Sequence, residues 1–135
     1  MAQLILNPNP ARIVGHATGT ASTNQPNLVE GRELSGPYGV AVDLSSGAVF
    51  VADTGNNRVL GWSSLANLRN GMAADIVLGQ RDRYSTSQLG PGSGFNIGLA
   101  FPVGLAVDAS GNLYVADAGN NRICLLYTSP SPRDS

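Results

Sequence analysis

An aspartate and an arginine recur at one spacing in two places along this chain of 135 residues. Asp53 precedes Arg58, and Asp117 precedes Arg122, each within the sequence Asp-x-Gly-Asn-Asn-Arg. A carboxylate and a guanidinium could bind a ligand, and they could equally form a charge-assisted hydrogen bond with each other. Because both pairs lie in the same local sequence, we expect them to stabilise a repeated turn.

A second pair of aspartates, Asp43 and Asp108, ends the two copies of a short apolar run, Gly-Val-Ala-Val-Asp and Gly-Leu-Ala-Val-Asp. These carboxylates could hold a metal, but we favour a role in capping the Ser-Gly turn that follows. His16 stands alone, and zinc needs three or four ligands. We therefore predict no metal and no cofactor. The repeated positions expected to be structural are Asp43, Asp53, Gly55, Asn56, Asn57, Arg58, Asp108, Asp117, Gly119, Asn120, Asn121 and Arg122.

Three side chains are candidates for binding: Arg81, Arg83 and Tyr84. They lie on the long segment between the two copies, and loops held by a rigid scaffold often carry function. The alternative is a solvated, variable loop. The nearby glycine-rich run 90–94 lacks the spacing and the Lys-Ser/Thr of a phosphate-binding loop.

The elements around these residues are β-strands. Gly39–Asp43 is short and apolar, as a buried strand would be, and Ala48–Asp53 alternates between two faces. The turn after Asp53 reverses the chain, and a third strand follows over Val59–Trp62. Ala11–His16 resembles Asp75–Gln80, at nearly the separation that divides the two copies, so both are expected to be fourth, outer strands.

These motifs resemble the NHL repeat, with its Pro, Gly-Val-Ala-Val-Asp, Gly and Asp-x-Gly-Asn-Asn-Arg-Val pattern. NHL repeats build β-propellers, most often six-bladed, from blades of four antiparallel strands. The resemblance therefore implies an all-β fold, an incomplete β-propeller with one whole blade and two partial blades.

The repeat divides the chain into five parts: 1–36 with the outer strand of a preceding blade and a long loop, 37–80 as a complete blade, 81–101 as a long inter-blade loop, 102–123 as the first half of the next blade, and 124–135 as a tail. The tail resembles a translated sequencing adapter, so we expect it to be non-native and to lie off the sheet. An incomplete ring exposes strand edges and apolar faces, which favour aggregation.

Composition narrows the function classes. The net charge is −1 and only 13% of residues are charged, so the basic footprint of a nucleic-acid-binding protein is missing. No apolar run is long enough to span a membrane. The N-terminus lacks the basic region and the long apolar core of a signal peptide, which leaves localisation open.

Two functions remain. The first is a non-catalytic propeller that presents loops to a protein, a peptide or a glycan. The second is a catalytic propeller, because the fold resembles amidating lyases and lactonase-like hydrolases that hold a metal in the central channel. We favour the binding scaffold, since the inner strands offer only Asp43 and Asp108 as ligands, and fold alone does not decide function.

Overall fold

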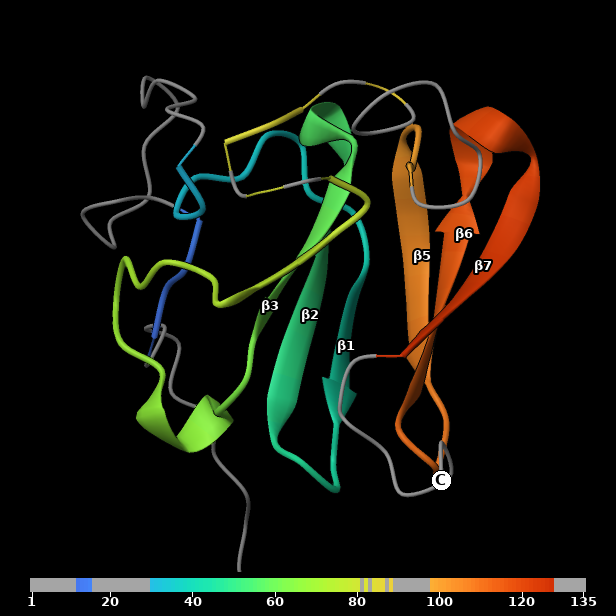
Figure 1. Cartoon of the computed structure of the whole chain (residues 1–135). Helices are drawn as coiled ribbons and strands as arrows, with labels where there is room; N and C mark the ends of the chain where they lie inside the picture. The colour runs from blue at the N-terminus through green and yellow to red at the C-terminus, as the bar shows by residue number, and fades with distance from the viewer. Residues whose placement is uncertain are drawn as a thin grey trace, which may run out of the picture.

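The computed structural model describes residues 12–15, 30–80, 82, 84–86, 88 and 98–127. These residues form two antiparallel β-sheets that do not close into a ring, one of four strands and one of three (Figure 1). The strands are β1 (Val40–Asp43), β2 (Ala48–Asp53), β3 (Arg58–Trp62), β4 (Ile76–Leu78), β5 (Pro102–Val107), β6 (Asn112–Asp117) and β7 (Arg122–Tyr127). Three 3₁₀ turns, η1 (Thr54–Asn56), η2 (Leu65–Asn67) and η3 (Ala118–Asn120), are the only helical elements described. The all-β class is confirmed, and the described part of the chain has no helix able to cross a membrane.

The first sheet has the order β1-β2-β3-β4. In its register Val51 lies opposite Val40 on one side and Leu60 on the other. Because side chains alternate along each strand, Phe50 and Val59 point to one face of this sheet while Val51 and Leu60 point to the other. Both faces are therefore apolar, as expected for a sheet packed between two others.

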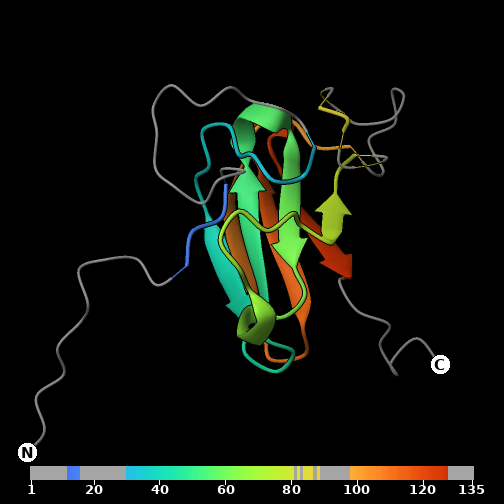
Figure 2. The same ribbon diagram turned by 90° about the vertical axis from the view of Figure 1, so that its left-hand side faces the viewer.

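A joint core fills the space between the two sheets. Phe50 and Val59 from the first sheet pack against Leu113 and Val115 from the second, and all four side chains are fully buried. The inner strands β1 and β5 approach so closely that a Cβ on Gly39 would lie 2.4 Å from a carbonyl oxygen of β5. Glycine is therefore required there, and the two sheets stand side by side (Figures 1 and 2).

The other face of the first sheet carries a second apolar cluster around Trp62, whose indole N–H donates to the carbonyl of Met72 at 2.8 Å. Val14 packs on this cluster. We expected 11–16 to be a strand, but the described residues 12–15 form only an isolated bridge between Gly15 and Glu33. No described strand runs beside them, so their backbone bonds to nearby loops instead.

The second sheet also differs from expectation. We expected the repeat to end at Ile123 and the tail to lie off the sheet, yet β7 continues to Tyr127 and pairs with β6 along its whole length. Cys124 and Leu126 pack against the joint core, whereas Leu125 points outward and is half exposed. An apolar run with this two-residue period satisfies a strand whatever its origin. The expectation is thus wrong for 124–127, and 128–135 lie outside the described residues.

Candidate functional site

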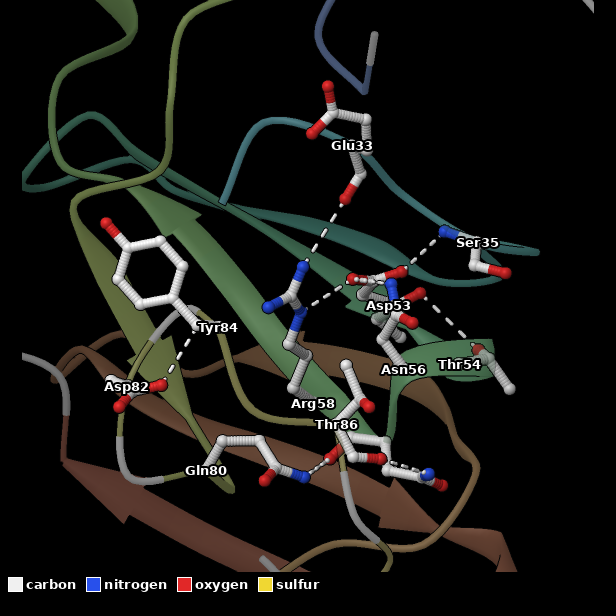
Figure 3. Close-up of polar contacts among 12 residues, drawn as sticks. Glu33, Ser35, Asp53, Thr54, Asn56, Arg58, Gln80, Asp82, Tyr84 and Thr86 are labelled. Carbon is white, nitrogen blue, oxygen red and sulfur yellow. Dashed lines mark hydrogen bonds and ion pairs between the residues drawn. The ribbon is translucent and has the colours of Figure 1, made fainter. Parts of the chain in front are cut away.

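A buried network surrounds the turn between β2 and β3 (Figure 3). The Asp53 carboxylate accepts from Arg58 Nε at 2.7 Å and from Asn56 Nδ2 at 3.0 Å, and the ion-paired side chains are fully buried. Asn57 ends the turn in the left-handed conformation, with φ 56°, which Asn tolerates better than most residues. Asp53 also binds outside its own turn, because its Oδ1 accepts the backbone N–H of Ser35, at 2.7 Å, from the segment that enters the blade.

The second copy repeats this network. Asp117 accepts from Arg122 Nε at 2.7 Å and from the backbone N–H of Ala100 at 2.7 Å. Arg122 also donates to the carbonyl of Gly98 at 2.6 Å. The hydrogen bond that Arg122 donates to Asp117 raises the pKa of Arg122 above its ordinary value. The Arg122 side chain is 27% exposed, whereas Arg58 is fully buried, so the first network alone is sealed from water on both sides of the ion pair.

The glycine of each turn has a steric role. A Cβ on Gly55 would lie 2.6 Å from the carbonyl oxygen of Ser35, and a Cβ on Gly119 would lie 2.6 Å from that of Ala100. The entering segment therefore rests directly on the turn, and the Asp, Gly and Arg of the motif hold one backbone segment together.

Asp43 and Asp108 occupy the turns at the opposite end of the sheets. Asp43 accepts from the Ser45 N–H at 3.0 Å and from the hydroxyls of Ser45 and Ser46. Burial raises the pKa of Asp43, but these hydrogen bonds outweigh it, and the pKa lies below its ordinary value. Both oxygens of the Asp43 carboxylate therefore accept hydrogen bonds from its own turn.

Asp108 makes the same kind of cap with different donors. It accepts from the backbone N–H groups of Asn112 and Ser110, from Asn112 Nδ2 and from the Tyr114 hydroxyl. The backbone bond from Asn112, followed by its side-chain bond, lowers the pKa of Asp108 to about 2. Both aspartates therefore stay ionised at neutral pH.

A pocket of about 460 Å³ lies between the two capped turns. Its lining residues are Val42, Asp43, Leu44, Ser45, Val107, Asp108 and Ala109. Among the described residues, no group of three or more His, Cys, Asp or Glu side chains is placed to hold a metal. The pocket can therefore offer two anionic, already hydrogen-bonded carboxylates to a ligand.

The inter-blade segment is tied to the first turn by Asn57. The Asn57 side chain donates to the carbonyl of Thr86 at 2.8 Å and accepts from the N–H of Phe101 at 3.0 Å. Gln80 adds a third tie, because its side chain donates to the Asn57 carbonyl at 2.9 Å. Tyr84 lies between Gln80 and Thr86, is 60% exposed, and its N–H donates to Asp82 at 2.9 Å. Of the three predicted binding residues only Tyr84 is described, since Arg81 and Arg83 lie outside the described residues.

Sequence reasoning missed Phe101. It adopts a left-handed backbone with φ 49°, a conformation that is strained for a bulky residue, and its side chain is 46% exposed. The aligned position in the first copy is Gly36, which has a similar φ of 58°. A large aromatic residue where the other copy has glycine was the available signal.

Comparison with protein families agrees with this geometry. The family model for the NHL repeat matches residues 34–62 and 99–124, which span the two turn networks and the segments entering them. Comparison with curated proteins gives no match.

Proposed function

We propose that this chain, a member of the NHL-repeat family with about two repeats, is part of a propeller that acts as a non-catalytic binding scaffold. Propellers built from blades of this kind present their connecting loops on a rigid frame. The partner we propose is a protein, a peptide or a glycan, bound at the end of the sheets where the inter-blade segment lies. Six blades remain a prediction taken from the family.

One observation carries this proposal: two exposed aromatic side chains lie beside backbone that is tied to Asn57. Tyr84 lies between Gln80 and Thr86, which both bond to Asn57, and the backbone N–H of Phe101 donates to the Asn57 side chain. Clamping lowers the entropy cost of ordering a loop when it binds, and aromatic side chains supply much of the binding energy at interfaces. Strain at an exposed residue such as Phe101 is also typical of functional sites.

The contacts that the repeated polar residues make favour a structural role for these residues. Asp53 and Arg58, with their counterparts Asp117 and Arg122, already satisfy each other and the backbone of the entering segment. A ligand that used these groups would first have to break buried, charge-assisted hydrogen bonds. We therefore assign them to shaping the turn.

The test is binding of the full chain to a displayed peptide library and to a glycan array, followed by affinity measurements on the best sequences or glycans. We expect Tyr84→Ala to weaken that binding about tenfold or more, as loss of an aromatic anchor does. Leu44→Ala is the matched control, because Leu44 is 93% exposed on a turn at the opposite end of the first sheet. Equal effects of the two substitutions, or no binding to either library, would contradict the proposal.

The second candidate is part of a metal-dependent catalytic propeller, and the pocket between Asp43 and Asp108 is the observation that favours it. Metal analysis of the purified chain distinguishes the two candidates. Stoichiometric, tightly held metal that is lost in the double variant Asp43→Asn and Asp108→Asn would replace the scaffold proposal with this one.

A further inference from the structure

Residues 12–15 pack on the first sheet in the same way that β4 and the glycine after it, Gly79, pack on the second sheet. A Cβ on Gly15 would lie 2.9 Å from Leu34 Cδ1, and a Cβ on Gly79 would lie 2.6 Å from Leu99 Cδ1. Both glycines have positive φ, of 110° and 92°, and each facing leucine precedes its sheet in the sequence. The segment 12–15 therefore occupies the place of the outer strand of a preceding sheet, on the side of the first sheet away from the second (Figure 1).

Among the described strands, none pairs with β7 in the way that this segment could. The order of the second sheet is β5-β6-β7, so β7 is an edge among the described strands. In the complete first sheet the equivalent strand β3 is covered by β4, with Val59 opposite Leu78. On the segment 12–15, Ile13 uses its N–H and C=O on the loop at Asn70 and Gly71, while Val14 takes part in none of the backbone hydrogen bonds described. Because neighbouring residues of an extended chain direct these groups to opposite edges, the edge at Val14 is not paired by any of the described residues.

The outer face of the second sheet copies the face by which the first sheet joins the second. Phe50 is fully buried in the joint, and its counterpart Tyr114 is 37% exposed. Val59 is fully buried, and its counterpart Ile123 is 69% exposed. The same holds for the inner strands: Gly39 meets the β5 backbone, whereas a Cβ on the equivalent Gly104 would meet only the side chain of Ala116, at 3.5 Å.

We propose that two copies of this chain associate head to tail, so that residues 12–15 of a second copy become the fourth strand of the second sheet. Antiparallel pairing in the register of β3 and β4 would set Val14 of the second copy opposite Ile123. The completed sheet would then pack its outer face on the β1 side of the first sheet of the second copy, where Val40 is 64% exposed, because Leu60 and Trp62 are already covered within their own chain. This proposal goes beyond the proposed function and does not depend on it.

A second copy fits this face because the back of its first sheet is the repeat equivalent of the surface that already fills the joint within one chain. The same copy also carries a segment, 12–15, that can pair with the edge of β7. The contact is heterologous, so it closes into a ring of one mass or extends as an open chain, according to the rotation at each joint.

The first test measures the mass of the full chain by analytical ultracentrifugation over a range of concentrations. We expect concentration-dependent association that Gly104→Ala weakens tenfold or more, because the added Cβ would meet the β1 backbone of the second copy as it would at Gly39. The same substitution should leave the melting temperature of the dilute monomer unchanged, since 3.5 Å is ordinary contact. Leu65→Ala, at a half-exposed side chain on η2 that lines neither the pocket nor either apolar cluster, should leave the mass distribution unchanged.

The second test fixes the register with disulfides in a Cys124→Ser background. Val14→Cys chains mixed with Ile123→Cys chains should form a mixed disulfide dimer, because directly paired residues have Cβ atoms about 4.5–5.5 Å apart. Leu44→Cys mixed with Ile123→Cys is the control and should not cross-link. A chain that stays monomeric at its highest soluble concentration would overturn the proposal, and would leave the face to a further sheet. Efficient cross-linking of Ile123→Cys chains to each other would overturn it in favour of a symmetric face-to-face dimer.

Discussion

Removing one carboxylate should cost more stability in the first turn network than in the second. Asp53→Asn keeps the size of the side chain and leaves the charged, fully buried Arg58 without the carboxylate that faces it. Breaking a buried ion pair in this way costs about 3–5 kcal/mol. Asp117→Asn leaves Arg122, which is 27% exposed and can regain water, so we expect a loss of about 1–3 kcal/mol, typical of one unsatisfied group.

Urea unfolding followed by the fluorescence of Trp62 measures both losses. Trp62 is the only tryptophan and is 1% exposed, so its emission should change when the first sheet opens. All variants must be compared at one low protein concentration, because association shifts apparent stability. If Asp53→Asn costs under about 1 kcal/mol, or if both variants lose the same amount, burial of the guanidinium is not what distinguishes the networks.

Three further outcomes are expected. Gly39→Ala should destabilise the chain by about 1–3 kcal/mol in the same assay, through overpacking of the two inner strands, while Gly104→Ala should not. Asp108 has a pKa depressed to about 2, so the stability it contributes is present above its unfolded pKa of about 3.9 and is lost as pH falls toward 2; Asp108→Asn should flatten the acid limb of a stability-against-pH curve. Leu126→Ala should lower the melting temperature more than Leu125→Ala, because only Leu126 packs against the joint core.

The strands of the first sheet could be predicted because each one satisfies two independent signals. Ala48–Asp53 alternates along a strand and also recurs in the second copy, and the structure places β2 over the same residues. The predicted strand Val59–Trp62 gains only Arg58 in the structure. The alternation along the strand and the recurrence in the second copy predict the same strands at these positions, and tertiary packing is consistent with both.

The ends of the chain were harder to predict, because their structure depends on what lies beside them. Residues 12–15 have the sequence of an outer strand, but a strand exists only where a neighbour pairs with it, and none of the described strands does so. We expected residues 124–127 to lie off the sheet because the tail resembles a translated sequencing adapter. The sheet responds only to apolar alternation, which Cys124 and Leu126 supply.

Part of the turn network was invisible in the sequence for a chemical reason. The group that Asp53 binds on the entering segment is the backbone N–H of Ser35, and the equivalent donor for Asp117 is the N–H of Ala100. Every residue except proline carries such a donor, so the two positions need not share a side chain. The motif therefore identifies the aspartate that recurs in both copies, but the backbone N–H that this aspartate binds can be found only from the fold.

The two copies of the repeat differ in how they can bind a following sheet, and the difference lies at Thr54. Its hydroxyl donates to the carbonyl of Pro102 at 2.5 Å and so links the first turn to the second sheet. The aligned residue in the second copy is Ala118, which has no donor to offer. A net contribution of about 1 kcal/mol from one such hydrogen bond changes an equilibrium about fivefold. The joint within one chain should thus hold more tightly than a joint made through the second copy, so association between chains can be reversible while the two sheets of one chain stay together.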